Sequence, residues 1–415
     1  MRAEYGLNMG YQQAWRSRAK ARESIAGKPI DSYSLLPSLI PFIVVAGTFL
    51  SSCSKGMLLS AVTQDGCGKY FPLAYSIVDS ENNQSWEWFF HRMRDCFGTR
   101  EELCIVSDIH DSISRPIKIA YPEAFHGICI YHLLNNVRGK FRKDSENIRI
   151  HFISAAKAYT EEKFRFHMTQ LDNIDAGIRK YLTDVGFDKW ARTESNHNRY
   201  CTMTSNIVES MNPVNKAARS LPVCALLAFL RATIQDWHHK YRTLAKSTTS
   251  ILTRKADENL KKNYIASLPL KVVPLNDFDH DVHDMAIIYT VNIEKKTCTC
   301  RRFQLDGIPC IHVVAVFRFL KCDPIQYCST YFLNETMTKT YSQTIYSIGI
   351  PSSWTVPEFV KEINILPLKE KPKAGRPKKT RYKSYREKLS TNTCSKCKKN
   401  GHNKKTCIAG AIIFH

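Results

Sequence analysis

The chain has 415 residues and a formal net charge of +22 at neutral pH, and 43% of its residues are hydrophobic. This length allows two or three domains with cores of their own, and the charge favours a polyanionic partner, above all nucleic acid. No apolar run reaches the about 18 residues that cross a bilayer, and the N-terminus lacks the apolar region of a signal peptide. We therefore expect neither a membrane protein nor a secreted one.

The first part of the chain predicts a short helix and then a sheet. Residues 1–30 are polar and helical in pattern. Three strand-like runs, rich in β-branched and aromatic residues, follow between residues 40 and 80. An amphipathic helix (WEWFFHRMRDCF) comes next, with Trp86 and Trp88 as expected core anchors. The short buried strand LCIVSD then delivers Asp108 at its carboxyl end, so three antiparallel strands, a helix and a further strand are predicted.

The rest of the chain predicts helices, a small mixed module and a basic tail. The pattern is helical and basic over residues 133–205, and two helices that break at Pro222 follow. We expect a polar helical connection over residues 238–285 and a β-hairpin with a helix over residues 286–321. Residues 369–388 hold ten Lys or Arg against two Glu without apolar periodicity, which predicts a disordered linker.

Two Cys/His clusters contain six of the fifteen cysteines, and without a signal peptide such clusters favour zinc over disulfides. The first has the spacing C-x-C-x9-C-x-H and supplies four ligands for a tetrahedral Zn²⁺ ion. Its first pair ends a strand and its second pair opens a helix. Metal binding is expected to fold a module that is too small to have its own core. The predicted ligands are Cys298, Cys300, Cys310 and His312.

The second cluster has the spacing C-x2-C-x4-H-x4-C and resembles the CCHC zinc knuckle of retroviral nucleocapsid proteins. It occupies residues 394–407, within a run of lysines. Because no obvious aromatic residue lies between the ligands to stack on bases, binding to the nucleic-acid backbone is better supported than base recognition. The predicted zinc ligands are Cys394, Cys397, His402 and Cys407.

The linker before this knuckle contains AGRPKKTR, which resembles half of an AT-hook. Arg376 and its glycine and proline neighbours are present, but Ala374 stands where the motif has an arginine. A preference for the minor groove is one hypothesis, and a nuclear-localisation tract or a solvated linker are the others. The predicted nucleic-acid-binding side chains are Arg376, Lys378, Lys379, Arg381, Lys398 and Lys399.

The order of several motifs resembles the transposase domain of plant Mutator-like (MuDR-type) elements, often called MULE. These motifs are GTFL, YFPLAYSIVDSEN, SWEWF, SDIHDSI, HGICIYHL and TSNIVESMN. The resemblance implies an α/β, RNase H-like domain over residues 40–237, with a mixed sheet and a helical insertion at about residues 133–205. The first zinc cluster resembles the SWIM zinc finger, which accompanies these transposases. Because Pro37 is only nine residues from Ala46, we expect the first strand to be truncated.

The resemblance also implies a site in which Asp, Asp and Glu hold two Mg²⁺ or Mn²⁺ ions for strand cleavage. The second Asp matches Asp108 and the Glu matches Glu209, but Ala46 stands where the first Asp should precede Gly47. A methyl group cannot ligate a metal, so we expect this site to be broken.

Other interpretations of the acids are open. Asp108 could be a helix N-cap and Glu209 a capping-box residue. Asp65 and Asp79 lie on neighbouring predicted strands, although no motif supports either as a substitute ligand.

Cys129 and His132 match the family's C-x2-H motif. The resemblance assigns this pair to the catalytic site, in contacts with metal or DNA. The alternative is a buried cysteine at a strand end, followed by a histidine at a helix start.

Together these features predict a transposase-derived protein of the plant nucleus that binds zinc and nucleic acid and has lost catalysis. The alternative is an active or partly active DNA strand-transferase that uses Asp108, Glu209 and a substitute acid. A decaying element fragment that does not fold stably is a third possibility. DNA is the expected partner, with single-stranded nucleic acid as a further candidate.

Overall fold

The computed structural model of the protein describes residues 41–51, 56–98, 102–195, 202–205, 218–345 and 395. The chain divides into two compact units, residues 1–368 and 369–415. Ser395 is the one described residue of the second unit, so every described helix and strand belongs to the first. The predicted N-terminal helix, basic linker and zinc knuckle lie outside the described residues, and so does Glu209.

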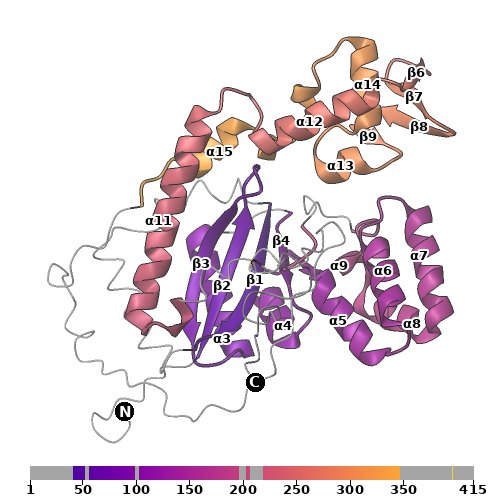
Figure 1. Ribbon diagram of the computed structural model, residues 1–415. Coiled ribbons are helices and arrows are strands. Elements are labelled where there is room, and N and C mark those ends of the chain that lie inside the picture. Colours follow the sequence, from indigo (N-terminus) through magenta and orange to yellow (C-terminus); the bar gives the residue numbers. More distant parts are fainter. Residues whose placement is uncertain are drawn as a thin grey trace, which may run out of the picture. The chain divides into compact units, whose positions relative to one another are not determined.

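A five-stranded mixed sheet organises the first part of this unit (Figure 1). Its strands are β1 (Phe42–Phe49), β2 (Met57–Gln64), β3 (Tyr70–Val78), β4 (Cys104–Ser107) and β5 (Phe125–Ile128). Their order is β3-β2-β1-β4-β5. The first three strands pair antiparallel, whereas β4 runs parallel to β1 and β5 runs parallel to β4. The predicted succession of three antiparallel strands, a helix and a further strand is confirmed.

The first strand is not truncated, contrary to our expectation. β1 has eight residues and lies in the middle of the sheet, paired with β2 over residues 44–49 and with β4 over residues 42–44. Its run of apolar and β-branched residues is long enough by itself to form a complete central strand. The pairing of Ala46 with Ser60 therefore fixes where the expected first ligand position lies.

Helices cover both faces of the sheet, because successive side chains of a strand point to opposite faces. These helices are α3 (Asn83–Phe97), α4 (Asp111–Ala120) and α11 (Val223–Ser247). The face that carries Val45 packs against α3 and α4, where Trp86 and Trp88 are buried as expected of core anchors. The face that carries Val44 packs against α11, through Trp237 among others.

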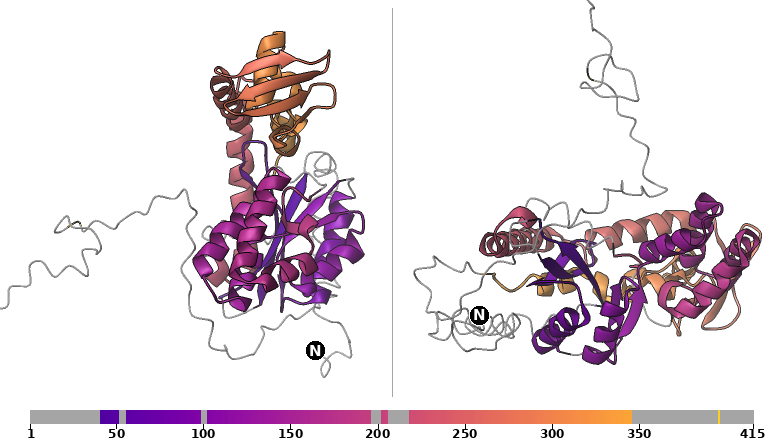
Figure 2. Two further views of the ribbon diagram at one scale, coloured as in Figure 1. Left: turned by 90° about the vertical axis from the view of Figure 1, so that its right-hand side faces the viewer. Right: turned by 90° about the horizontal axis from the view of Figure 1, so that it is seen from below.

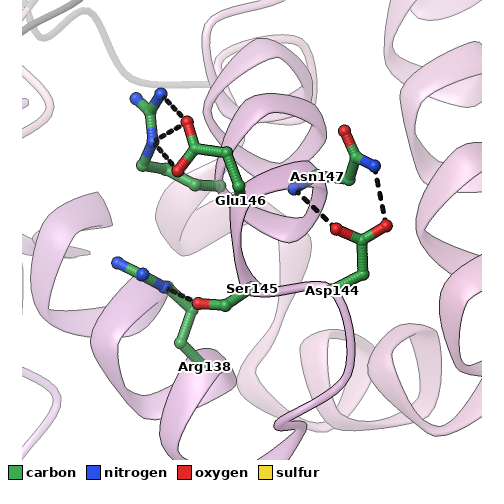
Figure 3. A network of polar contacts seen from close by, with 6 residues as sticks. Arg138, Asp144, Ser145, Glu146 and Asn147 are labelled. Atoms are coloured by element: carbon green, nitrogen blue, oxygen red, sulfur yellow. Dashed lines mark hydrogen bonds and ion pairs between the residues drawn. The ribbon is translucent and has the colours of Figure 1, made fainter.

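Five helices follow β5 and form a cluster with its own core (Figures 1 and 2). They are α5 (Ile130–Lys140), α6 (Ser145–Ala156), α7 (Glu161–Ile174), α8 (Ala176–Val185) and α9 (Phe187–Trp190). The rings of Phe152 and Trp190 stack in this core with centroids 5.0 Å apart. Figure 3 shows the start of α6, where the Asp144 carboxylate accepts the Asn147 N–H and Arg138 donates to Ser145. Side chains thus satisfy backbone groups that the first turn of a helix leaves unpaired.

A four-stranded antiparallel sheet and a buried helix form the last module of the unit (Figure 2). Its elements are β6 (Lys271–Pro274), β7 (Asp279–Asp284), β8 (Ile287–Asn292), β9 (Thr297–Cys298), α13 (Arg302–Asp306) and α14 (Ile311–Leu320). Val282 and Val291 of the sheet pack against Val313 and Phe317 of α14. The remaining elements are η2 (Ala218–Ser220), α12 (Arg254–Ser267), η3 (Pro324–Tyr327), η4 (Thr330–Phe332) and α15 (Asn334–Thr340).

The connection over residues 238–285 is helical only in its first part. The end of α11 and all of α12 lie there, but β6 and β7 follow and pair with β8. Strands form because Val272, Val282 and Val291 pack in one apolar cluster, and the pairing across strands outweighs the polar composition. Among the described helices, none has both the length and the apolar character that crossing a membrane requires.

Candidate zinc centre and acidic site

The four predicted ligands of the first zinc cluster lie together. Cys298 ends β9 and Cys310 is the residue before α14, and the loop between them turns at Arg301 and Gly307, both with positive φ. The side chains of Cys298, Cys300, Cys310 and His312 are buried, and their ligand atoms all lie within 4.8 Å of one another. Within the described residues, this is the one set of three or more such side chains that could hold a metal ion.

The distances in this set suit a tetrahedral zinc ion. Cys300 Sγ lies 3.5 Å from Cys310 Sγ, and Cys298 Sγ lies 3.5 Å from His312 Nδ1. With Zn–S bonds of about 2.3 Å, two thiolates of a tetrahedral site lie about 3.8 Å apart. Hydrogen bonds from Cys298 and Cys310 lower the pKa of the Cys300 thiol. The three sulfurs and one imidazole nitrogen would hold Zn²⁺ as a structural ion.

The second nitrogen of His312 is also held in place. Its Nε2 lies 3.3 Å from Asp284 Oδ2, at the end of β7, while Nδ1 faces the cysteines. The Tyr289 ring stacks on the imidazole, with centroids 3.9 Å apart and planes 18° apart. A carboxylate that accepts the distal N–H fixes the tautomer and orientation of a metal-binding histidine. The sequence pattern identified the four ligands but not Asp284, which lies 28 residues before His312.

The zinc loop contacts the helical cluster as well. The Tyr159 hydroxyl, between α6 and α7, donates to the Asp306 carboxylate at 3.0 Å. The guanidinium groups of Arg192 and Arg302 lie 4.4 and 4.9 Å from the centroid of the Tyr159 ring. Arg301 donates to the Thr193 carbonyl at 2.9 Å. Because α13 lies between the second and third cysteine ligands, the same piece of chain carries ligands and makes this contact.

The structure brings Ala46 and Asp108 to the same place in the sheet. The parallel pairs of β1 and β4 end at Val44 with Val106. Ala46 and Asp108 each lie two residues beyond this pair, Ala46 within β1 and Asp108 just after β4, so both lie at the same end of the sheet. Ala46 borders a buried apolar cluster there. The position expected for the first acid thus carries a methyl group, at the end of the sheet where Asp108 lies.

Asp108 is not the N-cap of the following helix. The N-cap of α4 is His110, whose Nδ1 accepts the Ser112 N–H. Asp108 is half-buried, and its Oδ1 accepts the N–H of Ile109 at 2.6 Å. The alternative interpretation of Asp108 as a helix cap is therefore wrong.

Neither acid that we considered as a substitute completes the site. Asp65 is buried in the turn after β2, where it accepts the N–H groups of Cys67 and Lys69 and the Tyr341 hydroxyl. β2 runs antiparallel to β1, whereas β4 runs parallel to β1. The carboxyl end of β2, where Asp65 lies, is therefore at the opposite end of the sheet from the carboxyl end of β4, where Asp108 lies. Asp79 is exposed and accepts the N–H of Ser80.

A third acid, which sequence reasoning missed, lies beside β1. Glu81 stands between β3 and α3, and a Cβ built on Gly47 would be 2.9 Å from its Oε1. The indole N–H of Trp86 donates to the same oxygen at 3.3 Å. Burial raises the pKa of Glu81 although the residue is partly exposed, and the charge of Asp108 adds to this rise. The only sequence signal was a glutamate directly after a strand and before an Asn N-cap.

Cys129 and His132 lie at the carboxyl end of β5, with Ser205 against them. Cys129 is fully buried, and its Sγ accepts both the N–H and the O–H of Ser205, each at 3.1 Å. Ser205 Oγ lies 3.2 Å from His132 Nδ1. Burial alone would raise the pKa of the Cys129 thiol, but the hydrogen bond and charge of His132 outweigh it, and the net shift is downward. Cys129 is thus a buried cysteine at a strand end, and His132 lies in the first turn of α5.

Comparison with known proteins agrees with the motifs. Residues 42–136 match the MULE transposase domain, and residues 289–321 match the SWIM zinc finger. A transposase for the insertion sequence element IS905, from Lactococcus lactis subsp. lactis, is 23% identical over 194 residues. That match covers 42% of this chain and 46% of the Lactococcus protein, so the chain spans about half the length of this curated relative. The resemblance to the MULE transposase domain and to the SWIM zinc finger is confirmed.

Proposed function

We propose that this chain, which carries a MULE transposase domain and a SWIM zinc finger, is a transposase-derived nuclear protein that binds nucleic acid and no longer transposes. The sheet order β3-β2-β1-β4-β5, with β2 antiparallel and β4 parallel to β1, supports an RNase H-like fold for the domain. We propose that this domain extends over residues 40–237, with the helices of residues 133–205 as an insertion. The finger would then begin near residue 286.

The observation that carries the loss of transposition is that Ala46 stands at the expected first acid position, at the end of the sheet where Asp108 lies. Two-metal cleavage needs carboxylates that hold both cations about 3.5–4 Å apart on either side of the scissile phosphate. With a methyl group at the first position, Asp108 and Glu209 alone would have to hold both ions. Removal of one member of a cooperating catalytic set removes most of the rate.

Nucleic-acid binding is supported by charge. The chain carries a net charge of +22, and the proposed contacts include Arg376, Lys378 and Lys379 of the basic linker, with Lys398 and Lys399 of the knuckle. Contacts of this kind bind phosphates without reading sequence. The zinc ion of the finger would serve folding rather than chemistry, because all four coordination positions have a protein ligand.

A cleavage assay tests this proposal. The purified chain would be incubated with Mg²⁺ or Mn²⁺ and a duplex that carries the terminal inverted repeats of a Mutator-like element. We expect retention of the duplex in a mobility-shift assay and no nicking. Metal-dependent nicking that disappears in Asp108→Ala and Glu209→Ala would contradict the loss of catalysis.

Glu81 supports one second candidate, a partly active strand-transferase. Its carboxylate lies close to Gly47, the residue after the position of the missing ligand. The charge of Asp108 contributes to the raised pKa of Glu81. If the wild-type chain nicks DNA, Glu81→Gln should abolish nicking as completely as Asp108→Ala does. Nicking that survives Glu81→Gln would exclude Glu81 as the substitute acid.

A further inference from the structure

We propose that Cys129 and His132 form an internal clasp with Ser205, and that this clasp holds residues 202–205 against the carboxyl ends of β4 and β5. In this role the C-x2-H pair positions protein chain and ligates neither metal nor DNA. The proposal does not depend on whether the protein cleaves DNA.

The contacts form one connected network, in which Cys129 and Ser205 are buried and His132 is half-buried. Cys129 is the N-cap residue of α5, but its side chain makes no capping bond there. Its Sγ instead accepts two hydrogen bonds from Ser205, and the Ile130 N–H beside it donates to the Met203 carbonyl at 3.0 Å. Cys129 and Ser205 each have an exposed fraction of 0%. The start of α5 thus binds residues 203 and 205 through backbone and side chain together.

The number of hydrogens on each group indicates which groups donate and which accept in this network. The Ser205 hydroxyl has one hydrogen, and the Cys129 sulfur takes it, so the oxygen is left to accept from His132 Nδ1–H. The Cys129 sulfur thus interacts with both partners, since it accepts from the Ser205 hydroxyl and also has a hydrogen bond with His132. A sulfur that accepts two bonds is best served as a thiolate, and the lowered pKa of Cys129 agrees with this.

The clasp joins the two stretches of chain that carry the ancestral acids. The Cys129 N–H donates to the carbonyl of Ser107, the residue before Asp108, at 2.8 Å. On the other side, Ser205 is four residues before Glu209, a stretch of chain that reaches at most about 14 Å. One buried cysteine therefore contacts the neighbour of Asp108 and a residue four positions before Glu209.

Amide hydrogen exchange of the full chain tests the clasp. Cys129→Ala removes the shared acceptor, and Ser205→Ala removes one donor. We expect exchange of the peptide over residues 202–205 to rise at least tenfold in Cys129→Ala and by less in Ser205→Ala. Cys129→Ser keeps a small acceptor at the same place and should restore part of the protection. The double variant should exchange no faster than Cys129→Ala, because both changes break one network.

Cys104→Ala is the matched control, since Cys104 is an equally buried thiol on the neighbouring strand β4. It should destabilise the sheet without selectively releasing residues 202–205. Unchanged exchange of these residues in folded Cys129→Ala, or in Ser205→Ala should the first variant not fold, would overturn the proposal. Zinc content gives a second readout: it should be equal in wild type and Cys129→Ala, and the loss of one zinc ion would make Cys129 a metal ligand instead.

Discussion

Ala46 is a single side chain whose replacement can be tested in isolation, because β1 holds it in register. Ala46→Asp would place a carboxylate at the end of the sheet where Asp108 lies. We expect Mn²⁺ to bind at least tenfold more tightly to this variant than to the wild type, which corresponds to about 1.4 kcal/mol. Electron paramagnetic resonance of free and bound Mn²⁺ measures the affinity.

The control for this change is the double variant Ala46→Asp with Asp108→Ala, which should return Mn²⁺ binding to the wild-type level. If the single variant binds Mn²⁺ no better than the wild type, the register of β1 and β4 does not bring these two positions together. Nicking activity that appears only in Ala46→Asp would show a scaffold that lacks one ligand.

Asp284 would act on a bound zinc ion through His312, whose Nε2 it contacts. Asp284→Asn keeps the size of the side chain but removes the charge that accepts from Nε2. Zinc affinity should fall by about 10- to 100-fold, as for other carboxylates behind a metal-binding histidine. Competition with a chromophoric chelator measures it. Asp281→Asn on the same strand, whose carboxylate accepts from Thr290, should leave zinc affinity unchanged.

At the scale of elements, α11 is joined to β3 and α15 through a buried histidine. The ring of His238 lies 5.2 Å from that of Phe71 and 5.3 Å from that of Tyr341, and its Nδ1 has no hydrogen-bond partner within the described part of the chain. Burial lowers the pKa of His238 to about 4. As the pH is lowered, the imidazole of His238 therefore becomes protonated near pH 6.5 in the unfolded chain, but only near pH 4 in the folded chain.

The stability of the fold should accordingly fall as the pH is lowered from 6.5 to 4. On the order of 3 kcal/mol is involved, since each pKa unit corresponds to about 1.36 kcal/mol. Urea unfolding at several pH values should show this loss in the wild type and a smaller loss in His238→Phe, which keeps a ring in the aromatic cluster. His239→Phe, at the exposed neighbouring position, should retain the full pH dependence. Equal pH profiles for all three proteins would contradict the assignment.

The sequence predicts those elements whose structure is indicated by residues close together along the chain. The runs of β-branched and aromatic residues in β1, β2 and β3 and the C-x-C and C-x-H spacings each indicate their structure without distant partners. Strands β6 and β7 were missed because their polar residues acquire strand character only by pairing with β8. Glu81, Asp284 and Ser205 were missed for a related reason, since each lies far along the chain from the group it serves.

At the scale of the whole molecule, the two Cys/His clusters predict two zinc ions per chain. Elemental analysis of reduced, folded protein should find both. Cys310→Ser should release one ion and locally unfold residues 286–321, because the finger needs its metal to fold. The knuckle zinc should remain. One zinc ion or none in the wild type would refute the expectation of two complete sites.

Binding to duplex DNA should weaken steeply with salt. If the linker and knuckle neutralise about six phosphates, the logarithm of the binding constant should fall with the logarithm of salt concentration at a slope near −5. Deletion of residues 369–407 should flatten this slope, as measured by fluorescence anisotropy between 50 and about 200 mM salt. An unchanged slope would locate the binding surface in the first unit instead.

The contact of Tyr159 with the zinc loop makes two parts of the chain thermodynamically linked. Zinc stabilises the loop between Cys300 and Cys310, and that loop presents Asp306 and Arg302 to the helices. Linkage is reciprocal, so whatever strengthens the docking of α13 on the helices raises zinc affinity by the same factor. The cellular zinc concentration would therefore affect how strongly the zinc loop docks on the helical cluster. Conversely, the zinc affinity of the finger would depend on the conformation of helices more than a hundred residues away in sequence.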